Sequence, residues 1–160
     1  MKYFYSLLFG FTFLLHSAVA QTDAEFGVKG GLNLTFFKVT EASFGDNIET
    51  DTGFYIGTFM EFPIDAFFSI QPEALYVGIG DFNFINVPIY AKYEVGRNFH
   101  LMAGPSINYF FDLFNAKLKI GADISTSYDL TPKLDAHIKF ALGFEEISPN
   151  GLFFGLGYKL

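Results

Sequence analysis

Apolar and polar residues alternate with a period of two along most of the chain. In the first such stretch, residues 24–36 (AEFGVKGGLNLTF), the even positions carry Phe26, Val28, Leu32 and Leu34, whereas the odd positions carry mostly glycine, lysine and asparagine. Successive side chains of a strand point to opposite faces, so this pattern predicts a strand with one apolar face. Its length is about twice that of an average globular strand.

The same alternation recurs seven more times. The further strands are predicted at residues 53–62, 67–77, 85–95, 99–109, 118–129, 134–144 and 151–160. No helical period interrupts them. The pattern therefore predicts an all-β protein of eight strands.

The connections between these strands alternate in length. Three are short (PIDA, GRN and LTPK), and four are longer (FKVTEASFGDNIETDT, GIGDFNF, FFDLFNAK and EEISPN). Short turns at one end and longer loops at the other are typical of an up-and-down antiparallel barrel, and bacterial outer-membrane barrels keep the short turns on the periplasmic side. Both termini would then lie at that end. Because open sheet edges cannot sit in lipid, the strand at 24–36 should pair with the strand at 151–160.

Alternation alone leaves open which face is outside, since a soluble lipocalin-like barrel has the same period. The polar face mixes glycines with both signs of charge, which suits a narrow lumen where charges pair. The apolar face is rich in Phe, Leu and Ile, with tyrosines near strand ends at positions 76, 93, 109, 128 and 158. These features favour an eight-stranded up-and-down antiparallel transmembrane β-barrel. Large residues predicted to fill its lumen are Tyr55, Phe59, Leu75, Tyr90, Met102 and Phe153.

Composition agrees with this reading. Hydrophobic residues make up 51% of the chain and charged residues 17%, compared with about 25% charged in typical soluble domains. Residues 1–20 combine Lys2, an apolar run and small residues at Ala18 and Ala20, which predicts a cleavable signal peptide before a single domain at 21–160. The chain has no cysteine, which excludes disulfides and a lipid-attached cysteine, and its charge of −7 disfavours nucleic acid as a partner.

Several stretches resemble a known family. FGVKGGLNLT, FSIQPEALY, NVPIYAKYEV, MAGPSINYFF and GLFFGLGYKL are similar, in this order, to the small outer-membrane β-barrel family of Bacteroidetes-type Gram-negative bacteria, called PorT-like or outer membrane protein beta-barrel domain. The resemblance implies a porin-like fold and an outer-membrane location. Because the family is functionally diverse, it implies no particular role.

The polar face supplies the candidate site, a lumen charge network. Its predicted members are Glu25, Lys29, Glu61, Glu73, Lys92, Glu94, Lys119, Asp123, Asp135, His137 and Lys139. Paired with one another, these groups would close the lumen and leave the barrel a structural or surface-binding role. The alternative is a narrow channel or transporter for ions or small molecules.

Two residue pairs raise the possibility of catalysis. Asp135 and His137 share one strand face and could act as an acid/base pair, and Ser106 with His100 could suggest a hydrolase. We expect a structural role for the first pair, and no enzymatic activity, cofactor or metal. A separate possibility is a divalent cation site formed by acidic residues of the first long connection, namely Glu41, Asp46, Glu49 and Asp51. Their spacing matches no regular ligand loop, so ordinary solvated charges are the favoured interpretation.

The last strand, GLFFGLGYKL, continues its apolar alternation to the final residue. It resembles the C-terminal signal read by the outer-membrane assembly machinery, with Gly155, Leu156, Tyr158 and Leu160 as its key positions. That signal usually ends on an aromatic residue, whereas this chain ends on leucine. The expected partners are therefore outer-membrane lipids and the assembly machinery. We expect a monomer, and the sequence identifies no surface ligand.

Overall fold

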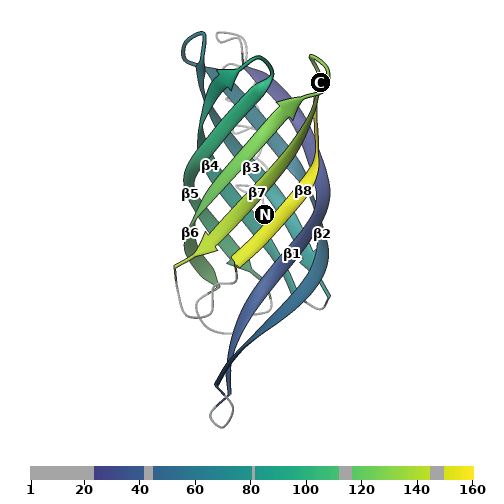
Figure 1. Ribbon diagram of the computed structural model, residues 1–160, viewed down its shortest axis with the longest axis vertical. Coiled ribbons are helices and arrows are strands. Elements are labelled where there is room, and N and C mark those ends of the chain that lie inside the picture. Colours follow the sequence, from purple (N-terminus) through teal and green to yellow (C-terminus); the bar gives the residue numbers. More distant parts are fainter. Residues whose placement is uncertain (1–23, 42–44, 81, 112–116, 145–149) are drawn as a thin grey trace, which may run out of the picture.

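The chain forms eight strands in one closed sheet, as a computed structural model shows (Figure 1). The structure describes residues 24–41, 45–80, 82–111, 117–144 and 150–160, and it describes the side chains of these residues except those at 37–41, 45–49 and 82. The predicted signal peptide, residues 1–20, lies outside the described residues. The strands are β1 (Glu25–Glu41), β2 (Gly45–Pro63), β3 (Phe68–Ile79), β4 (Phe82–Gly96), β5 (Phe99–Phe110), β6 (Leu118–Asp129), β7 (Leu134–Gly143) and β8 (Asn150–Lys159).

Every neighbouring pair of strands is antiparallel, and the order around the barrel follows the order along the chain. The barrel closes where β1 pairs with β8, from Gly27 opposite Lys159 to Phe36 opposite Asn150. The predicted pairing of the first strand with the last is therefore confirmed. Closure leaves no free sheet edge along the barrel wall, so the backbone groups of the wall bond to one another.

Short connections join the strands at one end of the barrel, which we call the turn end: residues 64–67, 97–98 and 130–133. Local hydrogen bonds shape these turns. Asp65 Oδ1 accepts hydrogen bonds from the backbone N–H of Phe67 at 2.8 Å and of Phe68 at 2.9 Å. Asn98 adopts a positive φ of 66°, a conformation that asparagine tolerates better than most residues. Leu160 lies at this end, where its N–H bonds to the Phe26 carbonyl oxygen at 2.9 Å.

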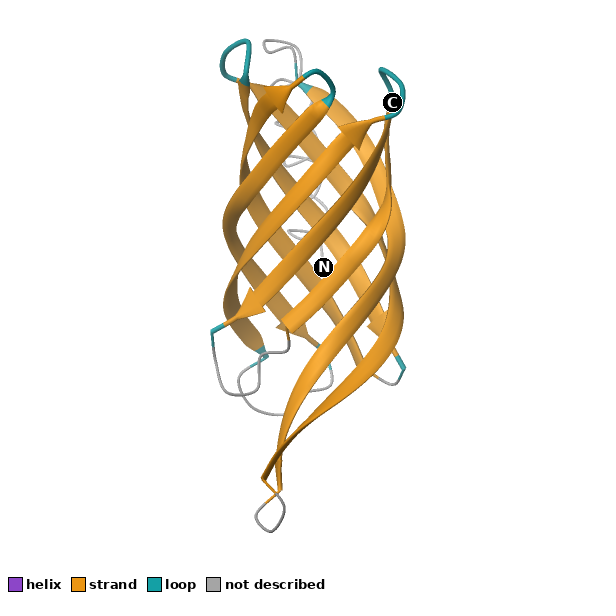
Figure 2. Cartoon of the chain, in the orientation of Figure 1, coloured by secondary structure: helices purple, strands orange, loops and turns teal. Residues whose placement is uncertain are grey.

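Two of the predicted long connections are wrong. Most of residues 37–52 continue β1 and β2, which pair with each other as far as Glu41 opposite Gly45. β8 pairs with β1 only as far as Phe36, and β3 pairs with β2 only from Phe54. The outermost part of the β1–β2 hairpin is therefore a two-stranded ribbon that projects beyond the barrel (Figures 1 and 2). We call this the hairpin end of the molecule.

The β3–β4 connection is also shorter than predicted. β3 ends at Ile79, β4 begins at Phe82, and these two residues pair, so only two positions separate the paired strands, of which the structure describes Gly80. Gly80 has a φ of 53°, which glycine adopts without steric cost. A Gly-Asp pair between alternating stretches is a hairpin signal, because tight hairpin turns need positive φ. Most of the two remaining long connections lies outside the described residues.

The interior of the barrel is its packed core. All six large residues predicted to fill the lumen are buried, and each is at most 2% exposed. An apolar cluster near the hairpin end includes Leu75, Val77, Phe84, Phe110 and Phe153. Polar side chains are buried in the same space, including lysines and carboxylates. The lumen is thus filled by side chains rather than open.

The outer face has the opposite character. Among the side chains that the structure describes, thirty large apolar or aromatic residues are exposed; Leu32 and Ile56 are each 61% exposed. Soluble monomers rarely expose contiguous apolar surface of this extent. The five outward tyrosines lie toward both ends of the wall, Tyr76 and Tyr109 toward the hairpin end and Tyr93, Tyr128 and Tyr158 toward the turn end. Within the described part of the chain, no helix is long and apolar enough to cross a membrane.

Candidate functional site in the barrel lumen

The lumen section nearest the turn end is organised around Glu61 of β2. Its carboxylate pairs with Lys92 Nζ at 2.8 Å and with Lys159 Nζ at 3.2 Å, and it accepts a hydrogen bond from Ser69 Oγ at 2.8 Å. Lys159 also contacts Glu25 Oε2 at 2.5 Å. This cluster joins strands β1, β2, β3, β4 and β8. Its outer members are half exposed, as the Glu25 side chain is 50% exposed, so only its inner members are removed from water.

Deeper in the lumen, Lys29 of β1 pairs with Glu73 of β3. The Lys29 Nζ to Glu73 Oε1 distance is 2.6 Å, and the two side chains are 4% and 0% exposed. Gln71 Nε2 donates a second hydrogen bond to the same oxygen at 2.8 Å. A buried carboxylate would be costly without such a partner. Each member of the pair therefore depends on the other.

A second buried pair joins Asp123 of β6 to Lys139 of β7, with 3.1 Å between Oδ2 and Nζ. Neutral side chains complete the environment of Asp123. Ser106 Oγ donates to Oδ1 at 2.6 Å, and Asn86 Nδ2 donates to Oδ2 at 3.3 Å. Lys139 Nζ donates in turn to Asn86 Oδ1. The pair is thus part of a network that spans β4, β5, β6 and β7.

A chain of three side chains connects β2 with β7. Asp135 Oδ1 lies 3.0 Å from His137 Nδ1, and His137 Nε2 lies 2.6 Å from the Tyr55 hydroxyl. Both imidazole nitrogens are therefore engaged within the lumen. The first pair considered for catalysis does come together, near the turn end, but its histidine is occupied by Tyr55 rather than directed at an open cavity.

Two glycines of β8 make room for this chain. Gly157 is paired with Asp135 and Gly155 with His137. A Cβ at Gly157 would overlap the Asp135 carboxylate, and one at Gly155 would overlap both the Tyr55 hydroxyl and the carbonyl oxygen of Gly30. Glycine at these two positions is thus required by close approach. The closing strand and the lumen side chains fit each other at this point.

The remaining predicted network residues also lie on the inner side of the wall. Glu94 is half-buried and lines a recess of the turn end together with His100 and Lys92. Lys119 is buried on the inner face of β6, in register with Asn108. The structure therefore places all eleven predicted residues at the lumen or its mouth.

The second pair considered for catalysis does not form. Ser106 donates its hydroxyl proton to Asp123, whereas His100 lies at the turn end of the same strand, where its Nδ1 is 3.8 Å from Asp129 Oδ1. Strand β5 separates the two residues by six positions, which is about 20 Å along an extended chain. The hydrolase interpretation of Ser106 and His100 is therefore wrong.

The acidic residues proposed as a divalent cation site lie on the paired strands of the hairpin rather than in a loop. Asp51 is exposed and stands opposite Thr35. The side chains of Glu41, Asp46 and Glu49 lie outside the described part.

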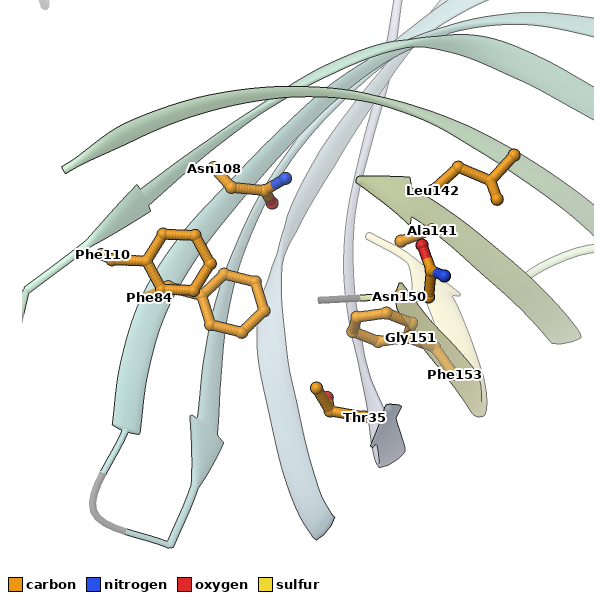
Figure 3. A pocket seen from close by; sticks show the side chains of 9 residues that line it. All are labelled: Thr35, Phe84, Asn108, Phe110, Ala141, Leu142, Asn150, Gly151 and Phe153. Carbon is orange, nitrogen blue, oxygen red and sulfur yellow. The ribbon is translucent and has the colours of Figure 1, made fainter. Parts of the chain in front are cut away.

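At the hairpin end the lumen becomes apolar and holds a small cavity, which we call the outer pocket (Figure 3). The side chains of Phe84 and Phe110 stack on one side, with ring centroids 4.7 Å apart, and Phe153 faces them from β8. The residues that line it are Thr35, Phe84, Asn108, Phe110, Ala141, Leu142, Asn150, Gly151 and Phe153. None of them is charged.

Sequence reasoning missed most of the neutral partners in the lumen. It listed the charged residues, but the hydrogen bonds that hold them come largely from Asn86, Ser69, Gln71 and Tyr55. All four occupy inward positions of the alternating pattern. Inward polar position was therefore the signal that could have identified them.

The closed eight-stranded barrel has an apolar outer wall and paired charges in its lumen. This is the architecture of a transmembrane β-barrel. A soluble carrier would have its polar face outside, which is the reverse of what is observed here. No protein-family model matches the chain, and no curated protein matches it.

Comparison with solved structures supports the fold. The chain is similar to the outer membrane protein Ail of Yersinia pestis in a phospholipid bilayer nanodisc, with a TM-score of 0.58 and 10% identity over 86% of this chain and 100% of that one. It is also similar to Neisserial surface protein A, with a TM-score of 0.53 and 16% identity over 86% and 97%. A de novo designed transmembrane β-barrel matches with a TM-score of 0.53 and 14% identity over 86% and 93%. At these identities the likeness concerns the fold alone.

Proposed function

We propose that this chain is an integral outer-membrane protein without enzymatic activity, whose lumen is closed by its own side chains and whose projecting β1–β2 ribbon provides a surface for binding. One observation carries the proposal. A wall of exposed apolar side chains surrounds a lumen in which buried lysines and carboxylates are paired. The apolar wall suits contact with lipid. The paired charges suit a lumen that is closed by side chains better than an open pore.

The location can be tested with single cysteines, because the natural chain has none. Thr50→Cys places a thiol at an exposed position near the ribbon, and Arg97→Cys is a matched control in a turn at the opposite end. On intact cells, we expect a membrane-impermeant maleimide to label the first variant and spare the second. Labelling of both variants only after lysis, or recovery of the protein in the soluble fraction, would contradict the proposed location.

Closure of the lumen predicts that the purified protein gives no steady ion conductance in planar bilayers. The pairs Lys29–Glu73 and Lys139–Asp123 support this, since both are almost fully buried. Steady single-channel currents that change when Lys92 is replaced would favour the alternative, a narrow channel or transporter.

The ribbon is the element proposed to bind a partner. Within the residues that the structure describes, its two strands pair with each other but not with β8 or β3, so both of its edges keep backbone groups without a strand partner. Such edges can accept an additional strand from another protein. A variant with residues 38–48 replaced by Asn-Gly should still fold into the barrel, which the heat-dependent gel shift typical of folded membrane barrels would show. Intact cells that carry this variant should no longer bind the partner.

Family membership and assembly are proposed on sequence grounds. The PorT-like resemblance suggests the Bacteroidetes-type small barrels, and export would use the signal at residues 1–20. Assembly would use Gly155, Leu156, Tyr158 and Leu160 in β8 as the signal for the barrel assembly machinery. Leu160→Phe, which restores the usual aromatic end, should raise the folded fraction in cells; an unchanged fraction would count against this role.

A further inference from the structure

A recess at the turn end leads from the solvent to buried polar side chains of the lumen. Its volume is about 150 Å³, and liquid water occupies about 30 Å³ per molecule, so the recess has room for a ligand of several non-hydrogen atoms. Residues 65–67 of the turn between β2 and β3 line its rim and are exposed. Glu61, Ser69 and Lys92 form its floor and are at most 9% exposed. A small molecule can therefore enter from the turn end and reach groups that are removed from water.

The charges at the floor of the recess cancel one another. Glu61 pairs with Lys92 at 2.8 Å and with Lys159 at 3.2 Å. Lys159 also pairs with Glu25 at 2.5 Å. Two carboxylates thus meet two ammonium groups. This cluster has no net charge, so it needs no counter-ion from a ligand.

Two further carboxylates line the recess without a cation of their own. Glu94 is half-buried, and within the described part of the chain its carboxylate forms no ion pair. Asp65 Oδ1 accepts hydrogen bonds from the N–H groups of Phe67 and Phe68, which orient the carboxylate but leave its charge in place. The recess therefore keeps two uncompensated negative charges. Partly buried charges of this kind are stabilised by a cation.

His100 adds a neutral acceptor to the wall of the recess. Its side chain is 12% exposed, and its buried Nδ1 has no hydrogen-bond partner within the described residues. Because Nδ1 lies 3.8 Å from Asp129 Oδ1, the carboxylate favours the neutral imidazole with its proton on Nδ1. Nε2 is then the acceptor. A ligand with several N–H donors is thus matched by acceptors of Glu94, Asp65 and His100, which come from three different elements.

The size and lining of the recess favour an organic cation. The volume greatly exceeds that of a metal ion, and Phe67 and Phe68 belong to the lining. Phe67 is 60% exposed at the rim. A guanidinium group is planar, stays charged, carries five N–H donors and stacks on aromatic rings, whereas an ammonium group offers three donors from a single point. A guanidinium group therefore fits both the separate carboxylates and the exposed ring.

We propose that the recess at the turn end is a binding site for a small molecule that carries a guanidinium group, with Glu94 and Asp65 as its counter-charges and Phe67 as the ring on which it stacks. The site lies at the opposite end of the molecule from the ribbon to which partner binding is assigned above. It requires no open path through the lumen.

The test compares two probes of nearly the same shape, ethylguanidinium and the neutral ethylurea. The predicted mature chain, residues 21–160, contains two histidines, His100 and His137. The protein, labelled with ¹⁵N-histidine in nanodiscs, is titrated at constant ionic strength while the imidazole signals are recorded. We expect ethylguanidinium to shift the His100 signals saturably and to leave those of His137, which lies deeper in the lumen. It should bind about tenfold or more tightly than ethylurea, because hydrogen bonds between charged groups are stronger.

Two variants of equal charge change provide the controls. Glu94→Gln keeps the size of the side chain and should weaken ethylguanidinium about fivefold or more while leaving ethylurea unchanged. Asp51→Asn, at an exposed position near the hairpin end, should leave both probes unchanged. The heat-dependent gel shift verifies folding of both variants, and the comparison of the two probes on the natural protein needs no variant.

Three results would overturn the proposal. One is equal binding of the two probes to the natural protein. Another is the absence of a His100 shift at saturating ethylguanidinium, or a shift that sodium chloride reproduces, which would mean screening of charge only. The third is an equal loss of ethylguanidinium binding in Glu94→Gln and Asp51→Asn, which would mean that the cation responds to the overall charge rather than to the recess.

Discussion

The two ends of the lumen are filled by side chains of different kinds. Toward the turn end, side chains such as Glu61, Lys92 and Asp135 fill the space as ion pairs and hydrogen bonds. Toward the hairpin end, Val77, Phe84 and Phe153 fill it with apolar volume. Both sections lie inside the same apolar wall.

The difference concerns how strongly the residues of each section depend on one another. Ionic groups in the lumen are stable only as partners, because each buried charge needs its counter-charge. Apolar side chains contribute through the volume that each one fills, and neighbours can partly compensate for its loss. Loss of one member should therefore have different consequences at the two ends, and the following experiments examine that contrast.

The largest effect is expected from Lys29→Met, which leaves Glu73 buried and unpaired. We expect the free energy of unfolding to fall by about 3–5 kcal/mol, measured by urea titration in lipid vesicles. The double variant Lys29→Met with Glu73→Leu removes both charges and should recover most of that loss. If the double variant is less stable than the single one, the interdependence described for this section is wrong.

Phe153→Ala should cost about 3 kcal/mol in the same measurement, at the lower end of the range for buried aromatic residues, because the outer pocket lets neighbours relax. The lost contacts include the Tyr55 ring, whose centroid lies 5.3 Å from that of Phe153. In contrast with the charged pair, a second truncation at Phe84 should add to this cost rather than offset it.

Gly155→Ala should destabilise the barrel by about 2 kcal/mol through overpacking, since the new methyl group would meet the Gly30 carbonyl oxygen of the backbone. Gly157→Ala should cost less, because the three atoms nearest to its new methyl group all belong to the Asp135 side chain, which can move more easily than backbone. Asp135→Ser should restore stability to the Gly157→Ala variant. A failure of this rescue would show that the close fit is not made by the carboxylate.

The smallest effect is expected from Glu25→Gln, at the exposed end of the ionic cluster. The change should alter stability by about 0–1 kcal/mol, and the difference should shrink as salt concentration rises. Unfolding at low and high ionic strength measures this. A loss comparable to that of Lys29→Met would mean that the turn end is drier than its exposure indicates.

The period-two pattern was sufficient to predict eight strands, their inward and outward faces and the closure of β1 on β8. It also placed the charged residues in the lumen. It was not sufficient to predict which lysine meets which acid. Lys29 and Glu73 are 44 positions apart in the chain, and their contact depends on the register of three strands together. A shift of register would move every partner, and alternation carries no information about such a shift.

The errors in connection length have a related cause. Residues 37–52 were interpreted as a loop because polar residues weaken the apolar alternation there. Apolar alternation is expected where one face of a strand contacts lipid. The ribbon projects beyond the barrel wall, so its strands pair without a continuous apolar face. The outer pocket was not foreseen, because its lining comes from β1, β4, β5, β7 and β8, which only the three-dimensional arrangement brings together.

The length of the ribbon is also independent of the strand pairing that builds the barrel wall. Five residue pairs, from Phe37 opposite Glu49 to Glu41 opposite Gly45, carry it about 17 Å beyond the last residue of β1 that pairs with β8. Because no other strand in the described part of the chain is bonded to these pairs, residues can be inserted or deleted two by two on each side of the hairpin without altering the register of the wall. The length of this arm can therefore vary among related sequences while the barrel beneath it remains the same.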